Sequence, residues 1–172
     1  MQNNFETRVG IGFDAHKFCA PKSNNPNTNH ITICGVEVAH PYSLQGHSDA
    51  DVGMHALVDA ILGSIKAGDI GEHFPPTDPK WKGADSKIFL YHTHHLLSES
   101  SSKIINIDIT IICEKPKITP HKDKMCETIA KILDIDVKRV SVKATTTEGM
   151  GFTGRKEGIA AQAIVSVLSK EV

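Results

Sequence analysis

The alternation of residues between positions 105 and 111 constrains the fold most strongly. Isoleucine occupies every odd position of this run, and Asn106, Asp108 and Thr110 occupy the even ones. Because successive side chains of a strand point to opposite faces, the pattern predicts a β-strand with one apolar and one polar face. The apolar face has to pack against a second layer, so a layered fold with helices over a sheet is expected.

Four other stretches are predicted to be strands that belong to the same sheet or lie beside it. Glycines alternate with apolar residues over 8–13, residues 31–38 resemble a second strand, and VSVKA predicts a strand from about Ser141. Residues 159–168 fit either a buried strand or a short helix, and their valines and isoleucines favour the strand. We therefore expect an α+β fold, with a mixed four- to five-stranded sheet and helices packed on one face.

The helices are predicted from apolar spacing and from capping residues. Between the first two, the Gly-, Pro- and Asp-rich stretch 69–85 is expected to be a long ordered loop. No internal repeat or domain boundary is visible, so residues 1–172 are expected to form a single domain. The expected helices run from Ser48 or Asp49 to Gly68, from about Ser86 to Leu97, and from Thr119 as cap, through Pro120, to near Asp134.

Composition excludes several classes of protein. The chain has 172 residues, of which 40% are hydrophobic, and a formal net charge of −1. Without surplus positive charge, binding to nucleic acid or to an anionic membrane is not expected. No apolar run approaches the roughly 20 residues of a membrane span, and no export signal is visible, so we expect a cytoplasmic protein. The four cysteines lack metal-knuckle spacing and are expected to be reduced.

A candidate metal site emerges from two of these elements. Asp14 and His16 lie one residue apart at the end of the first strand, so their side chains point the same way. Asp51, His55 and Asp59 follow one another at intervals of four along the edge of the first helix's buried face. If Asp14, His16 and His55 converge, they form a three-ligand site with an open fourth position, as in catalytic zinc centres. The alternative is that His16 merely bonds Asp14, while Asp51 or Asp59 satisfies His55.

The stretch from Lys143 to Gly158 suits a phosphate. Threonine hydroxyls, glycine N–H groups and the Arg155 guanidinium all donate to phosphate oxygens, and Glu148 would hold a divalent cation between two phosphates. The GxGxxG spacing at 149–154 is not a dinucleotide motif, because no amphipathic crossover helix follows it. The alternative is a glycine-rich hairpin between two strands. At the mouth of the first helix, His47 would offer an imidazole to a bound phosphate.

The chain contains four long motifs, which are GFDAH at 12–16, HSDADVGMHALVDAILG at 47–63, GDIGEHFPPTDPKWKGADS at 68–86 and VKATTTEGMGFTGR at 142–155. Together they closely resemble the 2-C-methyl-D-erythritol 2,4-cyclodiphosphate synthase family, and the resemblance runs from about Arg8 to Leu168. This family converts 4-diphosphocytidyl-2-C-methyl-D-erythritol 2-phosphate to the cyclic diphosphate and releases CMP, in the non-mevalonate route to isoprenoid precursors. The resemblance therefore implies a cyclising phosphorus–oxygen lyase.

The resemblance also implies an assembly and a set of metals. The family forms homotrimers, with a mixed sheet in each subunit and active sites between subunits. By motif, Asp14, His16 and His55 would bind zinc, which agrees with the three side chains selected from spacing. Glu148 would bind a second divalent ion, magnesium or manganese, across the diphosphate.

The resemblance further implies roles for residues around the substrate. His47 and Thr146 match positions that stabilise the transition state, and the segment at Asp69 matches the one that holds ribose and erythritol hydroxyls. The family's cytosine pocket falls on residues 113–119 and 144–146. The matching substrate-binding positions are Asp14, His16, His47, Ser48, Asp59, Asp69, Ile70, Gly71, Phe74, Asp78, Cys113, Pro116, Ile118, Thr119, Ala144, Thr145, Thr146, Thr147, Glu148, Phe152 and Arg155.

In the implied mechanism the 2-phosphate of the substrate attacks the β-phosphorus of its own diphosphate. The protein then has to fold one flexible ligand into an in-line geometry, without supplying a nucleophile. A zinc phosphohydrolase and a non-enzymatic nucleotide-binding protein are the alternatives, and neither explains the cytidine and ribose segments. Two departures from the family stand out: Pro76 replaces a frequent Asp, and an Asn-rich insertion follows His16.

Overall fold

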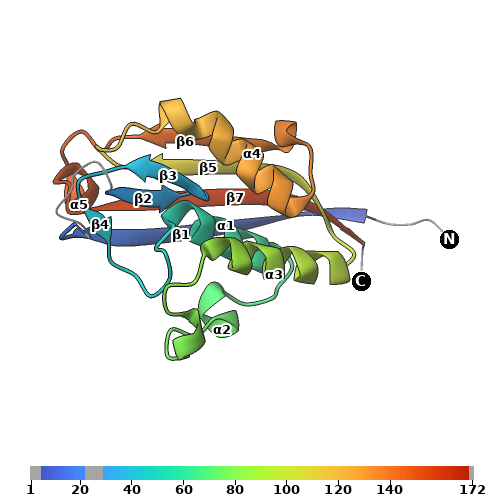
Figure 1. Cartoon of the computed structure of the whole chain (residues 1–172). Coiled ribbons are helices and arrows are strands. Elements are labelled where there is room, and N and C mark those ends of the chain that lie inside the picture. Colours follow the sequence, from blue (N-terminus) through green and yellow to red (C-terminus); the bar gives the residue numbers. More distant parts are fainter. Residues whose placement is uncertain (1–4, 22–28, 171–172) are drawn as a thin grey trace.

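The computed structural model describes residues 5–21 and 29–170, which form a five-stranded sheet, a separate hairpin and a helical layer (Figure 1). In the sheet the strand order is β4-β1-β7-β5-β6, and only β5 and β6 run parallel, so the sheet is mixed. The strands are β1 (Phe5–Cys19), β2 (His30–Ile33), β3 (Val36–Ala39), β4 (Ser43–Leu44), β5 (Lys103–Ile112), β6 (Val140–Thr145) and β7 (Gly158–Lys170).

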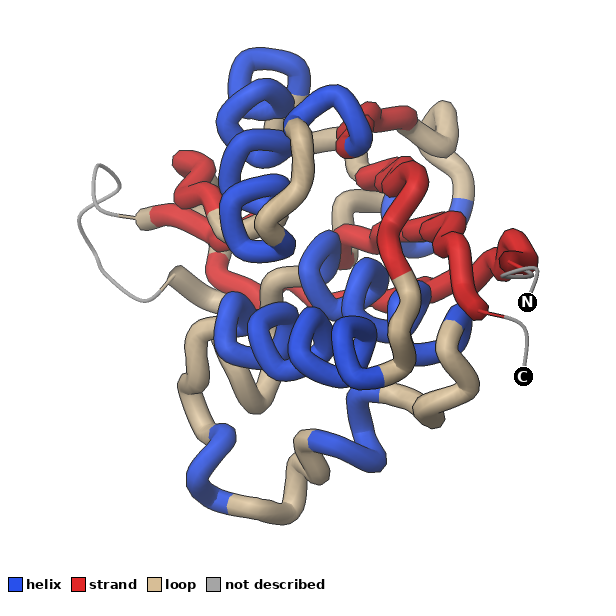
Figure 2. The backbone as a smooth tube through the Cα atoms, turned by 90° about the vertical axis from the view of Figure 1, so that its right-hand side faces the viewer, coloured by secondary structure: helices blue, strands red, loops and turns tan. Residues whose placement is uncertain are grey.

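The helices cover one face of this sheet. α1 packs against β1 and β7, α4 packs against β6, and α3 lies between α1 and α4. In Figure 2, which looks along the strands, the long helices lie to the left of the strands that carry the two termini. The helical elements are α1 (Val52–Ser64), α2 (Ile70–His73), the 3₁₀ turn η2 (Pro79–Trp81), α3 (Ser86–Glu99), η3 (Thr119–His121), α4 (Lys122–Leu133), η4 (Val137–Arg139) and α5 (Gly151–Gly154).

Two glycines let α1 approach β1 closely. Gly10 and Gly12 face the helix, and a side-chain carbon at either position would overlap the carbonyl oxygen of Ala60 or Ala56. Every second residue of β1 therefore points at α1, which includes Asp14 and His16. Gly10 and Gly12 thus determine how near the strand's polar end comes to the helix.

The predicted strand at 105–111 is confirmed, with one change at its beginning. The pairing of β5 with β7 shifts between Ile104 and Asn106, as in a β-bulge. As a result Ile104 is buried and Ile105 is 38% exposed, whereas Ile107 and the following odd positions stay in the core. The terminal stretch is the strand β7, as favoured over a helix.

The predicted second strand at 31–38 is wrong as a single element. Cys34 and Gly35 have φ angles of 51° and 74°, and they turn the chain between β2 and β3. A two-residue turn with both φ angles positive matches the right-handed twist of a hairpin. The predicted surface loop that follows β1 lies largely outside the described residues.

Three predicted helix boundaries also need correction. α1 is capped by Asp51, whose carboxylate accepts the Met54 N–H at 3.0 Å, and not by Ser48 or Asp49. The helix ends at Ser64, well before Gly68. Thr119 and Pro120 form a 3₁₀ turn, and α4 begins after it without a side-chain cap, so Thr119 is not its cap. The stretch 69–85 contains α2 and η2 and is more structured than a loop.

The opposite face of the sheet carries exposed apolar side chains. On β1, Val9, Ile11 and Phe13 are 65%, 61% and 57% exposed, and Ile164, paired with Ile11, is 45% exposed. Patches of this kind mark interaction surfaces. None of the helices among the described residues is long and apolar enough to cross a membrane. The four cysteines, all within the described part of the chain, are unpaired.

Candidate metal centre and active site

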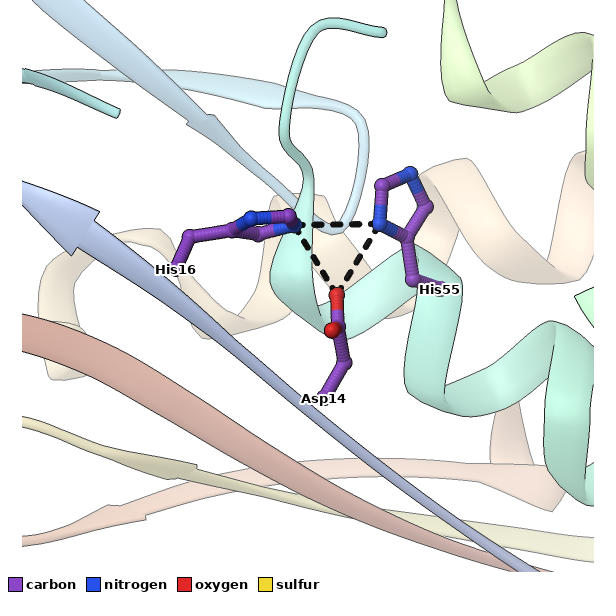
Figure 3. Close-up of side chains that lie close together, drawn as sticks. All are labelled: Asp14, His16 and His55. Carbon is purple, nitrogen blue, oxygen red and sulfur yellow. Dashed lines mark hydrogen bonds and ion pairs between the residues drawn. The ribbon is translucent and has the colours of Figure 1, made fainter. Parts of the chain in front are cut away.

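Asp14 and His16 from β1 meet His55 from α1 in a compact triangle (Figure 3). The Asp14 Oδ2 atom lies 2.9 Å from His16 Nε2 and 2.9 Å from His55 Nδ1, and the two imidazole nitrogens are 3.1 Å apart. Within the described residues, this is the one group of three or more carboxylate, imidazole or thiol ligands arranged to hold a metal ion. The structure therefore brings together the three side chains selected from the sequence.

The geometry of this triangle fits a metal ion. Ligand atoms about 2.0–2.1 Å from a tetrahedral zinc are roughly 3.3 Å from one another. The three observed separations, 2.9 to 3.1 Å, need only a slight opening to reach that value. The donor set of two imidazoles and a carboxylate also suits zinc, and it leaves the fourth tetrahedral position open.

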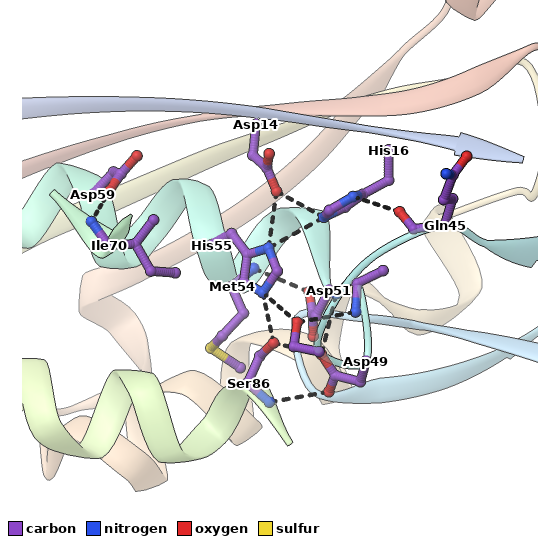
Figure 4. A network of polar contacts seen from close by, with 12 residues as sticks. Asp14, His16, Gln45, Asp49, Asp51, Met54, His55, Asp59, Ile70 and Ser86 are labelled. Carbon is purple, nitrogen blue, oxygen red and sulfur yellow. Dashed lines mark hydrogen bonds and ion pairs between the residues drawn. The ribbon is translucent and has the colours of Figure 1, made fainter. Parts of the chain in front are cut away.

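The second nitrogen of each histidine has its own partner (Figure 4). His16 Nδ1 lies 3.0 Å from the Gln45 carbonyl oxygen, which only accepts, so that nitrogen carries the proton and Nε2 is free for a metal. His55 Nε2 lies 2.8 Å from Ser86 Oγ and 3.1 Å from Ser48 Oγ. Each ring is therefore held in place by a hydrogen bond to the nitrogen that does not face the triangle, as metal-ligating histidines usually are.

The purely structural alternative for His55 does not match the contacts. Asp51 accepts N–H groups from Cys34 at 2.7 Å, from Gly35 and from its own helix, so it ties the β2–β3 turn to α1. Asp59 accepts the Ile70 N–H at 2.8 Å, which links α1 to the start of α2. Neither carboxylate bonds the imidazole. The pair of His16 with Asp14 is present, as that alternative expected, but as part of the triangle.

Burial and charge oppose each other at Asp14. Burial would raise the pKa of this carboxyl, but hydrogen bonds and charge from His16 and His55 outweigh it and hold the pKa well below its usual range. At Asp59 burial prevails and raises the pKa, although the Ile70 N–H and the His55 imidazole partly offset it. Asp14 therefore stays an anion under all ordinary conditions, as a metal ligand must.

A cavity of about 240 Å³ opens beside the triangle. It gathers segments that lie far apart in sequence, namely the end of β1, the stretch before α1, the 70–76 region and the start of α3. Six residues that were predicted to bind substrate line this cavity, and so does the predicted metal ligand His55. The full lining is His16, His47, Ser48, His55, Ile70, Gly71, Phe74, Pro76, Trp81 and Phe89.

The backbone around this cavity is held by side-chain caps. Asp69 caps α2 by accepting the Glu72 N–H at 3.0 Å, and Asp78 caps η2 by accepting the Lys80 N–H at 3.1 Å. His47 is exposed, and its carbonyl oxygen accepts the Gly83 N–H at 2.6 Å. α1 begins at its Asp51 cap, so His47 lies four residues before the cap and does not directly precede it, although it lines the same cavity as His55.

The glycine-rich segment joins β6 to β7 across the end of β5, so the alternative of a simple hairpin is wrong. Its turn holds Glu148 at a φ of 53°, next to Gly149 at 79°. The Thr146 hydroxyl donates to Glu148 Oε1 at 2.6 Å, and the Gly149 N–H donates to Glu114 at 3.3 Å. Arg155 forms a two-point ion pair with Glu157.

The predicted cytosine segment is partly buried. Cys113 and Ile118 lie in the core, and the Cys113 N–H donates to the Thr145 carbonyl oxygen at 3.1 Å. Pro116 lines a different cavity, of about 460 Å³. The aromatic part of its wall comes from Phe18, His40 and Tyr42. The other residues predicted to bind substrate within segments 113–119 and 144–155 are Thr119, Ala144, Thr147 and Phe152.

Within one chain the candidate residues thus form two groups. The metal triangle and the 240 Å³ cavity make one group, and residues 113–119 with 144–155 make the other. The second group contributes nothing to the lining of that cavity in the described part of the chain. The 240 Å³ cavity and the 460 Å³ cavity that Pro116 lines have no lining residue in common.

Sequence reasoning missed the polar support behind His55. Ser86 and Asp49 were assigned to helix starts, but the Ser86 hydroxyl contacts both His55 and Asp49 (Figure 4). It also missed that Trp81 and Phe89 form a wall of the cavity. The contact between Asp49 and Ser86 joins residues 37 positions apart, and no local pattern carries that information.

Comparison with known proteins identifies a matching family and curated relatives of this chain. A model of the YgbB family matches residues 7–168. The bifunctional enzyme IspD/IspF of Paramagnetospirillum magneticum is 57% identical over 162 residues, which are 94% of this chain and 41% of that relative. The chain therefore spans less than half the length of this curated relative.

Solved structures agree. The bifunctional IspDF of Campylobacter jejuni superposes with a TM-score of 0.89 at 40% identity, over 98% of this chain and 44% of that one. Plasmodium falciparum IspF, in a complex with CDP, superposes with a TM-score of 0.81 at 31% identity, over 99% of this chain and 100% of that one. Sequence and fold thus lead to one conclusion: the chain belongs to the YgbB family, the family of the 2-C-methyl-D-erythritol 2,4-cyclodiphosphate synthases that its motifs resemble.

Proposed function

We propose that this chain is a 2-C-methyl-D-erythritol 2,4-cyclodiphosphate synthase. It converts 4-diphosphocytidyl-2-C-methyl-D-erythritol 2-phosphate to the cyclic diphosphate and CMP. The observation that carries the proposal is the meeting of the Asp14, His16 and His55 triangle with a cavity lined by His47 and Ser48. Membership of the family and the CDP bound to a related structure support the choice of substrate.

The triangle would hold zinc, which supplies Lewis-acid polarisation of a phosphoryl oxygen and neutralises phosphate charge. Glu148 would hold a second divalent cation, magnesium or manganese, against the diphosphate. The Thr146 hydroxyl, 2.6 Å from Glu148, orients that carboxylate before substrate arrives. Arg155 and the glycine N–H groups complete the phosphate side, with Phe152 beside them.

The first group of residues would bind the erythritol end of the substrate. The exposed imidazole of His47 stabilises charge on the phosphate under attack, together with Thr146. Asp59 holds the Ile70 N–H and so keeps the segment of Asp69 and Gly71 in place for sugar hydroxyls. The aromatic wall of the cavity excludes water, which would otherwise hydrolyse the diphosphate. Asp78, which caps η2, would belong to the same end of the substrate site.

The cytidine end would occupy residues 113–119 and 144–147, and in the proposed homotrimer these come from a neighbouring subunit. Two observations support a shared site. No residue of the second group lines the 240 Å³ cavity among the described residues, and the sheet face of Val9, Ile11 and Phe13 is apolar and exposed. A cytoplasmic location, supported by four unpaired cysteines, completes the proposal.

Light scattering is expected to give the mass of three chains. Replacing Ile11 with Glu puts a charge on the apolar face, so it should yield smaller species that keep the metal but lose turnover. Tyr91→Glu is the matched control, because Tyr91 is 54% exposed on α3, away from that face. A stable Ile11→Glu monomer with undiminished turnover would contradict the shared site.

Product analysis tests the activity itself. Phosphorus NMR of the reaction is expected to show one cyclic diphosphate for each CMP released, because both remaining phosphorus atoms stay on the erythritol. Thr146→Ala and His47→Ala should each slow the reaction without changing that ratio, since they stabilise charge and do not choose the nucleophile. Linear diphosphate or inorganic phosphate as the main product would assign the chain to the hydrolases instead.

A further inference from the structure

The Ser86 hydroxyl connects the imidazole of His55 to a carboxylate that has no place in the metal triangle. Ser86 is fully buried at the first turn of α3, with its Oγ 2.8 Å from His55 Nε2 and in hydrogen-bond contact with Asp49 Oδ1. Asp49 Oδ2 also accepts the Ser86 N–H at 3.1 Å. Asp49, Ser86 and His55 therefore form a continuous chain of hydrogen bonds that ends at the triangle (Figure 4).

Asp49 determines which group donates in each hydrogen bond of the series from Asp49 through Ser86 to His55. An ionised carboxylate only accepts, so the Ser86 hydroxyl has to donate its proton to Asp49. The lone pairs of Ser86 Oγ then face His55, and Nε2 has to carry a proton to donate to them. With its proton on Nε2, a neutral His55 has a lone pair on Nδ1, the nitrogen that faces Asp14 Oδ2 and His16 Nε2, and a metal ion in the triangle would take this lone pair.

Ser48 cannot impose this direction by itself. Its Oγ is farther from His55 Nε2, at 3.1 Å, and it accepts only a long contact from the Ala50 N–H at 3.3 Å. No carboxylate contact holds the Ser48 hydroxyl proton among the hydrogen bonds of the described residues, so this hydroxyl turns to donate or to accept. His16 is held in the corresponding way by the Gln45 carbonyl oxygen.

We propose that Asp49 and Ser86 are positioning residues that hold His55 in the one tautomer able to bind the metal. This inference rests on the metal centre of the proposed function and extends it to two residues outside that centre. Groups behind metal-bound histidines commonly change metal affinity by about 10- to 100-fold when they are removed. The pair thus contributes to the retention of the metal and not to contacts with the substrate.

Zinc affinity of the purified protein, measured by competition with a chromophoric chelator, tests the proposal. Ser86→Ala is expected to weaken zinc binding by about 10- to 100-fold. Asp49→Ala should weaken it at least as much, because no carboxylate then accepts the Ser86 hydroxyl proton and this proton can turn toward Nε2. Asp85→Ala is the matched control, since Asp85 caps the same helix turn through the Lys87 N–H at 2.9 Å without touching His55.

A spectroscopic signature separates positioning from stability. In the zinc-loaded protein with ¹⁵N-labelled histidine, the Nε2 proton of His55 should exchange slowly, and in Ser86→Ala it should exchange rapidly. Asp85→Ala should lower the melting temperature and leave both the affinity and this proton unchanged. Zinc affinity of Ser86→Ala within threefold of the native value would overturn the proposal. If His55→Ala also kept its zinc, the metal centre itself would fail.

Discussion

Replacing His55 with alanine is expected to abolish the retention of zinc and to lower turnover by about a thousandfold or more. The change removes one of three ligands and leaves Asp14 and His16 without a third partner. A bound metal supplies several kcal/mol of charge stabilisation in phosphoryl transfer, and each 1.36 kcal/mol corresponds to about tenfold in rate. Metal analysis after dialysis against a weak chelator and a CMP-release assay measure the two effects.

The matched control for this prediction is His95→Ala. His95 is exposed on α3, 3.5 Å from Glu99, so its loss should affect neither zinc nor turnover. Circular dichroism should show that His55→Ala remains folded, because α1 keeps its Asp51 cap and its buried apolar side chains. Full zinc stoichiometry in both His16→Ala and His55→Ala would remove the metal assignment.

Gly12→Ala is expected to destabilise the protein by about 3 kcal/mol or more and to weaken metal binding as well. The new methyl group would overlap the Ala56 carbonyl oxygen and lie 2.9 Å from the Ala60 nitrogen. Added atoms in packed interiors commonly cost about 1–3 kcal/mol, and backbone atoms of a helix yield less than a flexible side chain does. Urea unfolding and zinc competition measure the two effects.

The second effect distinguishes this prediction from a general loss of packing. α1 carries His55, so a helix displaced from β1 also moves that imidazole away from Asp14. The control is Gly63→Ala on the same helix, where the position is exposed and a methyl group would meet nothing within 4 Å. It should stabilise the protein by about 1 kcal/mol through helix propensity. A Gly12→Ala protein as stable as the native one would contradict the close approach of α1 and β1.

Local patterns predicted the parts of the fold that depend on one period. The alternation at 105–111 specified a strand, and the spacing of Asp14 and His16 placed both side chains on one face of β1. The expected single apolar stripe of α1 was too narrow, because the helix is buried on nearly every side, but His55 does meet the end of the strand as expected. These features depend only on the geometry of one strand or one helix.

Features that depend on contacts distant in sequence were not predictable in this way. The Cys34–Gly35 turn was hidden inside an apolar run, and it is held by the Asp51 carboxylate from another element. The predicted cap of α1 was wrong for the same reason. The Asp51 carboxylate accepts N–H groups from both the turn and the helix. The support of His55 by Ser86 likewise required the packing of α3 against α1.

The motifs did not by themselves say which candidate residues lie together within one chain. Motifs place residues in order along the chain, whereas the structure separates the metal cavity from the segment that contains Thr146 and Glu148. The family resemblance implied a site shared between subunits, and the separation of the two groups among the described residues supports that proposal.

The origin of the oxygen atoms in the product tests the central claim, intramolecular cyclisation, most directly. The reaction is run with purified protein in water enriched in oxygen-18, and the cyclic diphosphate and CMP are analysed by mass spectrometry. If the 2-phosphate of the substrate is the nucleophile, neither product contains solvent oxygen, and every CMP is matched by one cyclic diphosphate. One solvent oxygen in the erythritol product or in CMP would mean that water attacks the diphosphate, and the synthase assignment would be wrong even with zinc bound at His55.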